Sequence, residues 1–316
     1  RLDNILQEKS SPSATARRVF RSVLFGDRHP FGLQTAGNES SIRAITRKEL
    51  TDFHRIYWKP SNAVLLFAGD IRMSEAIQLV NEDLSSWEDL EVPQVCLPEV
   101  SPPQGIHIFL VDRQDAPQSQ IRIGSTGPSR KTVDYYAIEL MNAILGGSFT
   151  SRLNLNLRED KGYTYGASTG FAYGREAGFW AGGTAVQTLV TSQALIELRK
   201  EVSAIRRATP ITNAELTLAK QNLVRGFAQR FETLGRLIGQ MSELFAYDLS
   251  VETMASYPEA IDKVGLADVQ AAAEKYLKDD ELVIVVVGDL GQVEENIRKL
   301  DLGKVTVVDF DGDRLK

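Results

Sequence analysis

The sequence predicts an α+β fold made of a duplicated domain, with mostly antiparallel sheets packed by helices and with the first copy truncated. Two observations predict this class. In the second half of the chain strand patterns come first and helical patterns follow, which favours α+β over a doubly wound fold. A segment of 27 residues also recurs without a gap, at an offset of 219 residues. At 316 residues, with 43% hydrophobic and 25% charged side chains, the chain matches about two globular domains.

The recurring segment is Ile45–Ile71 in the first copy and Val264–Leu290 in the second. Each copy predicts an amphipathic helix, a polar turn, an apolar strand and then Gly-Asp. Thr46 and Glu49 form a capping box at the start of the first helix. The apolar runs lack polar alternation, so they predict strands that are covered on both faces. These runs are Val64–Phe67 and Leu282–Val287.

The Gly-Asp pair after each strand predicts a turn in which Asp70 or Asp289 caps the next helix. Metal binding by these aspartates is less favoured, because neither copy has a second type of ligand nearby. The helices expected after the turns are Met73–Trp87 and Val293–Leu300.

The repeat predicts that the first copy lacks its first half. Residues 88–105 form a proline-rich linker, and the second copy begins at Ile106. Shifted by the repeat offset, the start of the first copy would fall 113 residues before position 0. We therefore expect residues 1–87 to be the C-terminal half of a first domain and residues 106–316 to be a second domain. Preceding residues or another chain would supply the missing half.

The second domain begins with β-rich patterns and continues with helical ones. Gly146-Gly147 is expected to form a C-cap after the first helix, with Ser148, Thr150 or Ser151 capping the short helix that follows. Gly174–Gly178 is expected to be a hairpin turn. The expected elements are strands Ile106–Val111 and Gln120–Ser125, helices Asp134–Leu145 and Thr188–Ala208, and helical structure from the Thr212/Glu215 capping box to about Tyr247.

Composition excludes several kinds of function. The net charge is −6 and the basic residues are dispersed, which argues against nucleic-acid binding. No apolar run approaches the roughly 20 residues that a membrane-spanning helix needs. The single cysteine, Cys96, excludes an intramolecular disulfide and a Cys-based zinc site. The histidines His29, His54 and His107 form no i, i+4 pair, so the chain has no local zinc pair and no convincing catalytic centre.

Three stretches resemble one known family. Leu145–Ala167 (LGGSFTSRLNLNLREDKGYTYGA) is similar to the signature of the inactive-side domain of the pitrilysin/insulinase zinc metallopeptidases, which include mitochondrial processing peptidase and core subunits of a respiratory complex. Leu24–Gly37 resembles the loop after the long helix of the family's active-site domain, and Ile45–Asp70 resembles the segment that closes each domain. The resemblance covers essentially the whole chain and implies a protease, a zinc-dependent hydrolase.

The resemblance implies that the zinc site lies outside this sequence. The family binds zinc through an inverted His-x-x-Glu-His on a first-domain helix and a later glutamate. By the repeat offset, that helix would precede residue 1. Its counterpart in the second copy reads YYAIEL within Asp134–Leu145 and has no histidine. Zinc is thus expected in the intact enzyme and not on this chain, which alone is expected to be inactive.

The resemblance also implies two substrate-binding residues, Arg158 and Tyr165. Arginine can donate a charge-assisted hydrogen bond to a substrate carbonyl, and a tyrosine hydroxyl can stabilise a tetrahedral oxyanion. Without the resemblance, the sequence predicts only that Arg158 is a cation at a helix C-terminus and that Tyr165 is an aromatic residue in a strand. Both readings expect the pair near the turn at Lys161-Gly162, with Tyr165 beginning the first hairpin strand.

Two functions remain open. The first is part of a zinc metalloendopeptidase that degrades or processes peptides, with this chain supplying the Arg/Tyr side of the chamber. The alternative is a non-catalytic, metallopeptidase-like scaffold or partner subunit. Expected partners are a peptide substrate and either the missing N-terminal half or a second chain in a homo- or heterodimer. The compartment stays open between periplasm and cytoplasm for a soluble bacterial protein.

Overall fold

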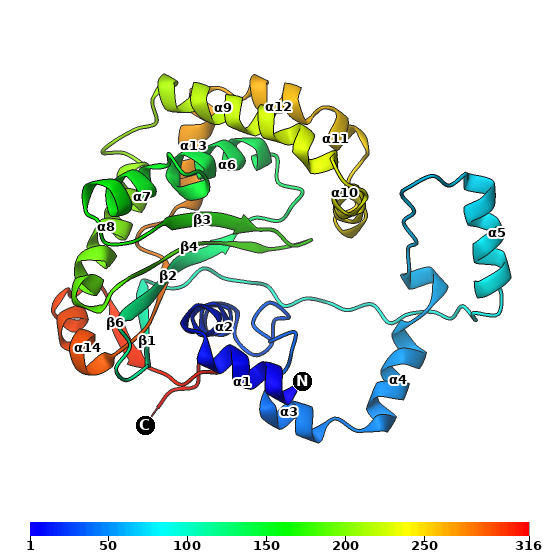
Figure 1. Cartoon of the computed structure of the whole chain (residues 1–316), viewed down its shortest axis with the longest axis horizontal. Coiled ribbons are helices and arrows are strands. Elements are labelled where there is room, and N and C mark those ends of the chain that lie inside the picture. Colours follow the sequence, from blue (N-terminus) through cyan, green and yellow to red (C-terminus); the bar gives the residue numbers. More distant parts are fainter. Residues whose placement is uncertain (316) are drawn as a thin grey trace.

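The computed structural model describes residues 1–315, and its centre is one six-stranded sheet formed by the second half of the chain (Figure 1). The strands lie in the order β3-β4-β2-β5-β1-β6. Their bounds are β1 Ile106–Asp112, β2 Gln118–Gly127, β3 Ala167–Ala172, β4 Gly178–Gln187, β5 Leu282–Gly288 and β6 Lys304–Val307. Pairs are antiparallel from β3 through β4 and β2 to β5, and parallel from β5 through β1 to β6. This mixed, mainly antiparallel sheet packed by helices confirms the predicted fold class.

One face of the sheet is covered by most of the helices, over a single large hydrophobic core. β5 is buried along its whole length, as its unbroken apolar run predicts. The helices on this side are α6 Tyr135–Asn142, α7 Arg152–Asn154, α8 Thr191–Ala204, α9 Asn213–Phe227, α10 Leu234–Ala246, α11 Glu252–Ala255, α12 Tyr257–Lys263, α13 Leu266–Tyr276 and α14 Leu290–Lys299. No helix within residues 1–315 is both long and apolar enough to cross a bilayer.

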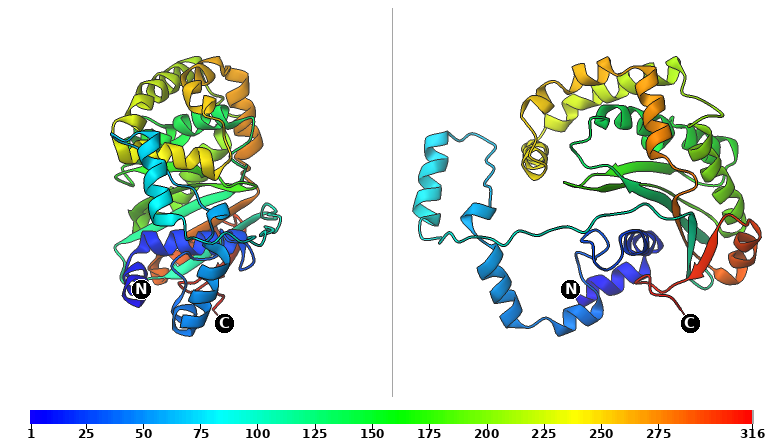
Figure 2. Two further views of the ribbon diagram at one scale, coloured as in Figure 1. Left: turned by 90° about the vertical axis from the view of Figure 1, so that its right-hand side faces the viewer. Right: turned by 180° about the vertical axis from the view of Figure 1, so that it is seen from behind.

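The opposite face of the sheet is covered by α2 (Pro12–Phe25), which comes from the other end of the chain (Figure 2). Ala16, Val19 and Phe20 on α2 are fully buried against the sheet. The valines that they meet on β5 are Val283, Val285 and Val287. Arg18 adds an ion pair, with its Nη2 2.6 Å from Asp311 Oδ1 near the C-terminus. No local pattern predicts this packing, because an amphipathic helix does not specify which surface it covers.

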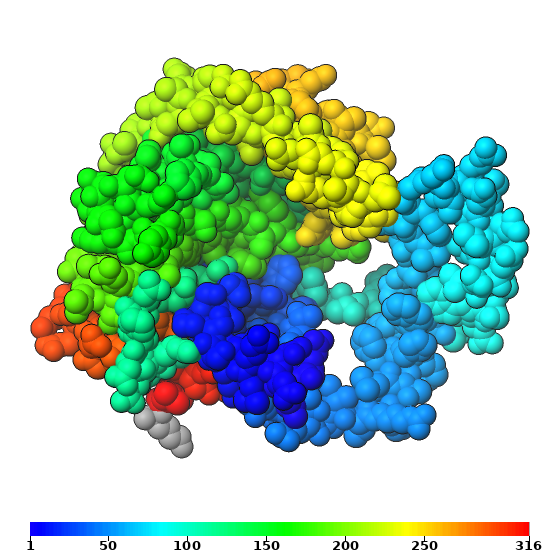
Figure 3. Space-filling model, in the orientation of Figure 1, coloured from blue at the N-terminus to red at the C-terminus, as the bar shows by residue number. Residues whose placement is uncertain are grey.

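The segment after α2 forms an arm that stands away from the sheet. It contains α3 (Glu39–Ala44), α4 (Arg47–Tyr57) and α5 (Met73–Leu84), and α1 (Leu2–Ser10) precedes α2. Figure 3 shows the arm joined to the remaining molecule by narrow connections, with open space between the two. Residues 88–105 return to the sheet without forming a helix or strand.

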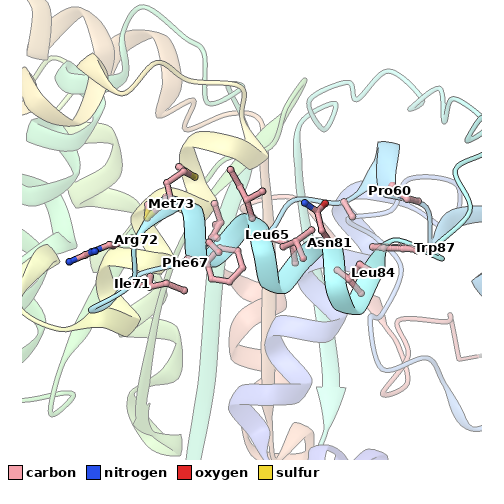
Figure 4. Close-up of a pocket in the computed structure, with 15 residues that line it drawn as sticks. Pro60, Leu65, Phe67, Ile71, Arg72, Met73, Asn81, Leu84 and Trp87 are labelled. Atoms are coloured by element: carbon pink, nitrogen blue, oxygen red, sulfur yellow. The ribbon is translucent and has the colours of Figure 1, made fainter.

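The predicted strand at Val64–Phe67 is wrong for this chain, because residues 63–70 pair with no strand in the described part. A strand persists only where neighbouring strands satisfy its N–H and C=O groups. Leu65 and Phe67 instead line an apolar hollow of about 690 Å³ between this segment and α5 (Figure 4). Among the described residues of the second half of the chain, Met241 on α10 is the one that lines the hollow.

The two predicted aspartate caps differ. Asp289 caps α14 as expected, because its Oδ1 accepts a hydrogen bond from Gly291 N at 3.1 Å. Asp70 caps nothing: α5 begins after Arg72, whose N–H donates to Glu75 Oε2 at 2.8 Å. The turn at the end of the first copy therefore runs two residues longer than the pattern predicts.

The predicted C-cap at Gly146-Gly147 is also wrong. Neither residue has a positive φ, and both belong to the π-helical turn Ala143–Gly147 that ends α6. A Cβ added to Gly146 would lie only 2.5 Å from Thr169 Oγ1 on β3. Glycine is thus needed here so that the helix can approach the strand closely.

Candidate functional site

The segment between α6 and β3 carries both predicted substrate-contacting residues, and a buried asparagine fixes it. Asn154 Nδ2 donates to Ser148 O at 3.1 Å and to Ala167 O at 2.8 Å. Asn154 Oδ1 accepts from Ala167 N at 3.0 Å. These bonds tie the end of α7 to the start of β3, so the residues between them form a closed loop. Sequence reasoning missed Asn154, because its partners Ser148 and Ala167 are brought to it only by the fold.

Arg152 anchors the same segment to α9. Its Nε and Nη2 lie 2.6 and 2.8 Å from the two carboxylate oxygens of Glu215. Its remaining N–H groups donate to the carbonyls of Thr209 and Pro210. Partial burial opposes ionisation of Glu215, but hydrogen bonds from Arg152 and Thr212 lower the pKa of that carboxyl to about 2. Arg152 is therefore a structural residue, and it leaves Arg158 as the arginine available at this loop.

Arg158 lies in the π-helical turn Leu155–Asp160. Its guanidinium lies over the ring of Phe149, 4.2 Å from the centroid, and its Nη1 is 3.6 Å from Glu159 Oε1. Part of the side chain stays accessible to solvent. The cation–π contact orients the guanidinium without neutralising it through a close ion pair.

Tyr165 lies in the loop before β3. The sequence predicts that Tyr165 begins the strand, but β3 begins at Ala167. The reason is Thr164, whose Oγ1 donates to Gly166 O and accepts from Gly166 N and from Thr184 Oγ1. These bonds bend the backbone and hold it in place. The side chain of Tyr165 is 93% exposed, so its ring has no packing role in this chain.

The structure places Arg158 and Tyr165 on the same closed loop without joining them. No hydrogen bond, ion pair or aromatic contact links the two side chains within residues 1–315. Their convergence on one bound peptide stays a prediction.

A groove of about 540 Å³ begins at Gly166, directly after Tyr165. It lies on the sheet face that carries α2, across strands β3, β4 and β2. Small residues such as Ser168, Gly170 and Gly183 form its floor. Arg17 from α2 and Arg122 from β2 supply its positive charge.

The described residues do not fit a zinc site. No group of three or more His, Cys, Asp or Glu side chains in residues 1–315 is placed to hold a metal. The histidines lie on separate elements. His29 is buried, its Nδ1 accepts from Phe31 N at 3.1 Å, and burial lowers the pKa of its imidazole. His54 stacks on Trp58, and the Nε2 of His107 is 3.0 Å from Gln104 O.

The helix that the resemblance matches to the family's zinc helix is α6, and most of its side chains are buried in the core. Burial raises the pKa of Glu139, although Arg230 and a hydrogen bond from the Tyr173 hydroxyl oppose this. Tyr135 on the same helix packs under the guanidinium of Arg130, 3.5 Å from the ring centroid. This helix face is a polar part of the core and presents no ligands.

A protein-family model described as the peptidase M16 inactive domain matches residues 44–223. The chain belongs to the M16 peptidase family. This confirms the resemblance to the pitrilysin-type family of zinc metallopeptidases.

Similar proteins support the place of the chain in the M16 family. An uncharacterized zinc protease of Mycobacterium leprae is 25% identical over 278 residues, which cover 87% of this chain and 62% of the relative. A crystal structure of a peptidase M16 inactive domain from Pseudomonas fluorescens superposes with a TM-score of 0.82 at 24% identity, over 91% of this chain and 68% of that one. A chain of complex III2 from Candida albicans gives a TM-score of 0.75 at 16% identity, over 95% and 73%. The chain thus spans less than two thirds of the length of its M. leprae relative.

Proposed function

We propose that this M16 chain forms the substrate-binding side of a zinc metalloendopeptidase, with Arg158 and Tyr165 contacting the peptide. Family membership and the zinc-protease relatives support a metallopeptidase-like part. The observation that carries the proposal at residue level is the exposure of Tyr165 on a loop that Thr164 and Asn154 hold in place. Binding residues often lie on loops that a rigid scaffold positions, which favours a binding role for this exposed aromatic.

Each residue would supply a hydrogen bond to the peptide backbone. The Tyr165 hydroxyl would donate to the carbonyl oxygen of the bond being cleaved, and more strongly as that oxygen gains negative charge. Arg158 would donate to a neighbouring carbonyl and hold the peptide in register. Zinc and its ligands belong, in this proposal, to the other half of the enzyme.

The other half is the preceding part of the polypeptide or a partner chain in a homo- or heterodimer. The apolar hollow beside α5 and the unpaired segment at Leu65–Phe67 support this need. Exposed apolar surface and unpaired strand edges are stabilised when another segment covers them.

The test is Tyr165→Phe in the full-length protein, which includes the zinc half. We expect peptide turnover to fall by at least about tenfold, toward the roughly 100–1000-fold loss seen for single oxyanion donors, with KM changed much less. The matched control is Tyr163→Phe, which removes a hydroxyl two residues away from a ring packed against the core. Full turnover in Tyr165→Phe would contradict the proposed role of the Tyr165 hydroxyl.

The same full-length protein distinguishes the enzyme from the scaffold alternative. A full-length wild-type protein that binds zinc in a one-to-one ratio and cleaves unfolded peptides supports the enzyme. A protein that holds no zinc and cleaves nothing supports the non-catalytic scaffold or partner subunit.

A further inference from the structure

Three arginines gather beside the groove that begins at Gly166. Arg17 and Arg21 lie one turn apart on α2, so their side chains project from the same side of that helix. Arg122 projects from β2 to the same sheet face, because its neighbours Ile121 and Ile123 point into the core on the other face. Its guanidinium lies over the ring of Phe20 on α2, 5.3 Å from the centroid.

These arginines lack the carboxylate partners that the buried arginines Arg18 and Arg130 have. None of the three forms an ion pair with another residue in the described range 1–315. Arg17 contacts the Ser13 hydroxyl at 3.2 Å, Arg21 donates to Phe31 O at 2.8 Å, and the buried Nε of Arg122 has no partner. Arg18, on the same helix, shows the contrast through its ion pairs with Asp311 and Glu8.

The electrostatics of the three groups favour the binding of an anion. Burial, and to a smaller extent the positive charges of Arg17 and Arg21, lowers the pKa of Arg122 to about 10. Like charges held close together without a counter-ion destabilise one another. A bound anion would remove both the repulsion and the unsatisfied N–H.

The floor of the groove leaves room for an extended chain. On β4 Gly183 lies opposite Arg122, and on β3 Ser168 continues the same row. A Cβ on Gly183 would lie 3.0 Å from Ile121 O, so the floor beside the guanidinium consists of backbone without a side chain. The groove therefore extends from Gly166, directly after Tyr165, to Arg17 and Arg122.

We propose that Arg122, with Arg17 and Arg21, forms a subsite for a carboxylate of the extended peptide whose backbone contacts Tyr165. This inference rests on the proposed function and adds a substrate class, peptides that carry an acidic group. Guanidinium groups bind carboxylates through paired, charge-assisted hydrogen bonds, which makes arginine the suited residue. The carboxylate can belong to an Asp or Glu side chain or to the peptide's C-terminus.

The test measures the binding of short fluorescent peptides to the full-length protein after zinc is removed by a chelator, so that nothing is cleaved. Four otherwise neutral peptides carry Glu or Gln at one central position, each with a free or an amidated C-terminus. We expect at least about tenfold tighter binding for a peptide with a carboxylate than for the Gln, amidated peptide. Preference for Glu assigns the subsite to a side chain, and preference for the free terminus assigns it to the chain end.

Two variants connect the preference to the arginines. Arg122→Gln and Arg17→Gln should abolish most of the preference while the Gln, amidated peptide binds as before. The control is Arg225→Gln on α9, which removes the same charge from an exposed position on the helical side of the sheet. Thermal melting checks folding, and Arg17, which is exposed, keeps the test valid if Arg122→Gln unfolds.

Two outcomes would overturn the inference. Peptides that bind without discrimination, or a preference that survives both arginine variants, remove the carboxylate subsite and leave the proposed function intact. If none of the four peptides binds, the peptide-binding function itself fails together with the subsite.

Discussion

The two copies of the repeat have nearly the same pattern but different structures. Their helices, α4 and α13, have bounds that differ by the repeat offset at both ends. The apolar run that follows is a fully buried central strand in the second copy and an unpaired segment in the first. Leu65 is 50% exposed, whereas Ile284 at the matching position is 0% exposed. A helix is specified by its own residues, but a strand also needs neighbours that a local pattern does not supply.

The largest expected effect comes from shortening the matched side chains Ile284 and Leu65. Ile284→Ala should lower the free energy of unfolding by about 2–5 kcal/mol, because it leaves a cavity in the core. Leu65→Ala should cost less than about 1 kcal/mol in this chain, because its side chain is already half exposed. Urea unfolding followed through fluorescence of the buried Trp180 and through circular dichroism measures both.

The comparison sharpens if the proposed missing half is supplied. In the full-length protein Leu65→Ala should cost as much as Ile284→Ala, if residues 63–69 there become a paired strand. Equal costs in the present chain alone would contradict the difference between the copies.

A smaller effect concerns the same capping box in two settings. Glu215→Gln should cost about 1–2 kcal/mol at neutral pH, after allowance for solvent screening. The folded-state pKa of Glu215, about 2, lies below the ordinary 4.5, so this stabilisation is complete above pH 4.5 and is lost as the pH falls toward 2. The difference in unfolding free energy between wild type and Glu215→Gln should therefore shrink over that range.

The control for this prediction is Glu49→Gln in the first copy. Thr46 also lowers the pKa of Glu49 through hydrogen bonds, but Glu49 is fully exposed and has no arginine partner. Its substitution should leave global unfolding unchanged. An equal loss in both variants would show that the capping box, and not the Arg152 ion pair, accounts for the effect.

The smallest expected effect separates the two Gly-Asp turns. Asp289→Ala removes the cap of α14 and should cost about 1 kcal/mol. Asp70→Ala should change nothing measurable, because α5 is capped by Arg72 and Glu75 instead. The melting temperatures of the two variants and of the wild type measure both effects. A lower melting temperature for Asp70→Ala would mean that the turn differs from the one described.

The features that sequence predicts correctly here are local. The helices of the repeat, the Thr212 capping box and the hairpin between β3 and β4 follow from residues close together in the chain. The resemblance names Arg158 and Tyr165, but the bend before β3 depends on Thr184, twenty residues downstream of Thr164. The anchor at Asn154 depends likewise on where β3 begins. The sequence does not predict the long-range contacts, because no short stretch of sequence contains both partners.

The cover that α2 places on the sheet has a consequence for how this protein can be divided. A gene fragment beginning at Ile106 would encode every strand and still leave Val283, Val285 and Val287 bare on one face. The folding unit is discontinuous in sequence, because α2, which covers the sheet, is translated before the first strand. A recombination crossover in residues 88–105 would combine this sheet with a covering helix from another protein. The parts of the chain before and after this segment must therefore be inherited, expressed and engineered together.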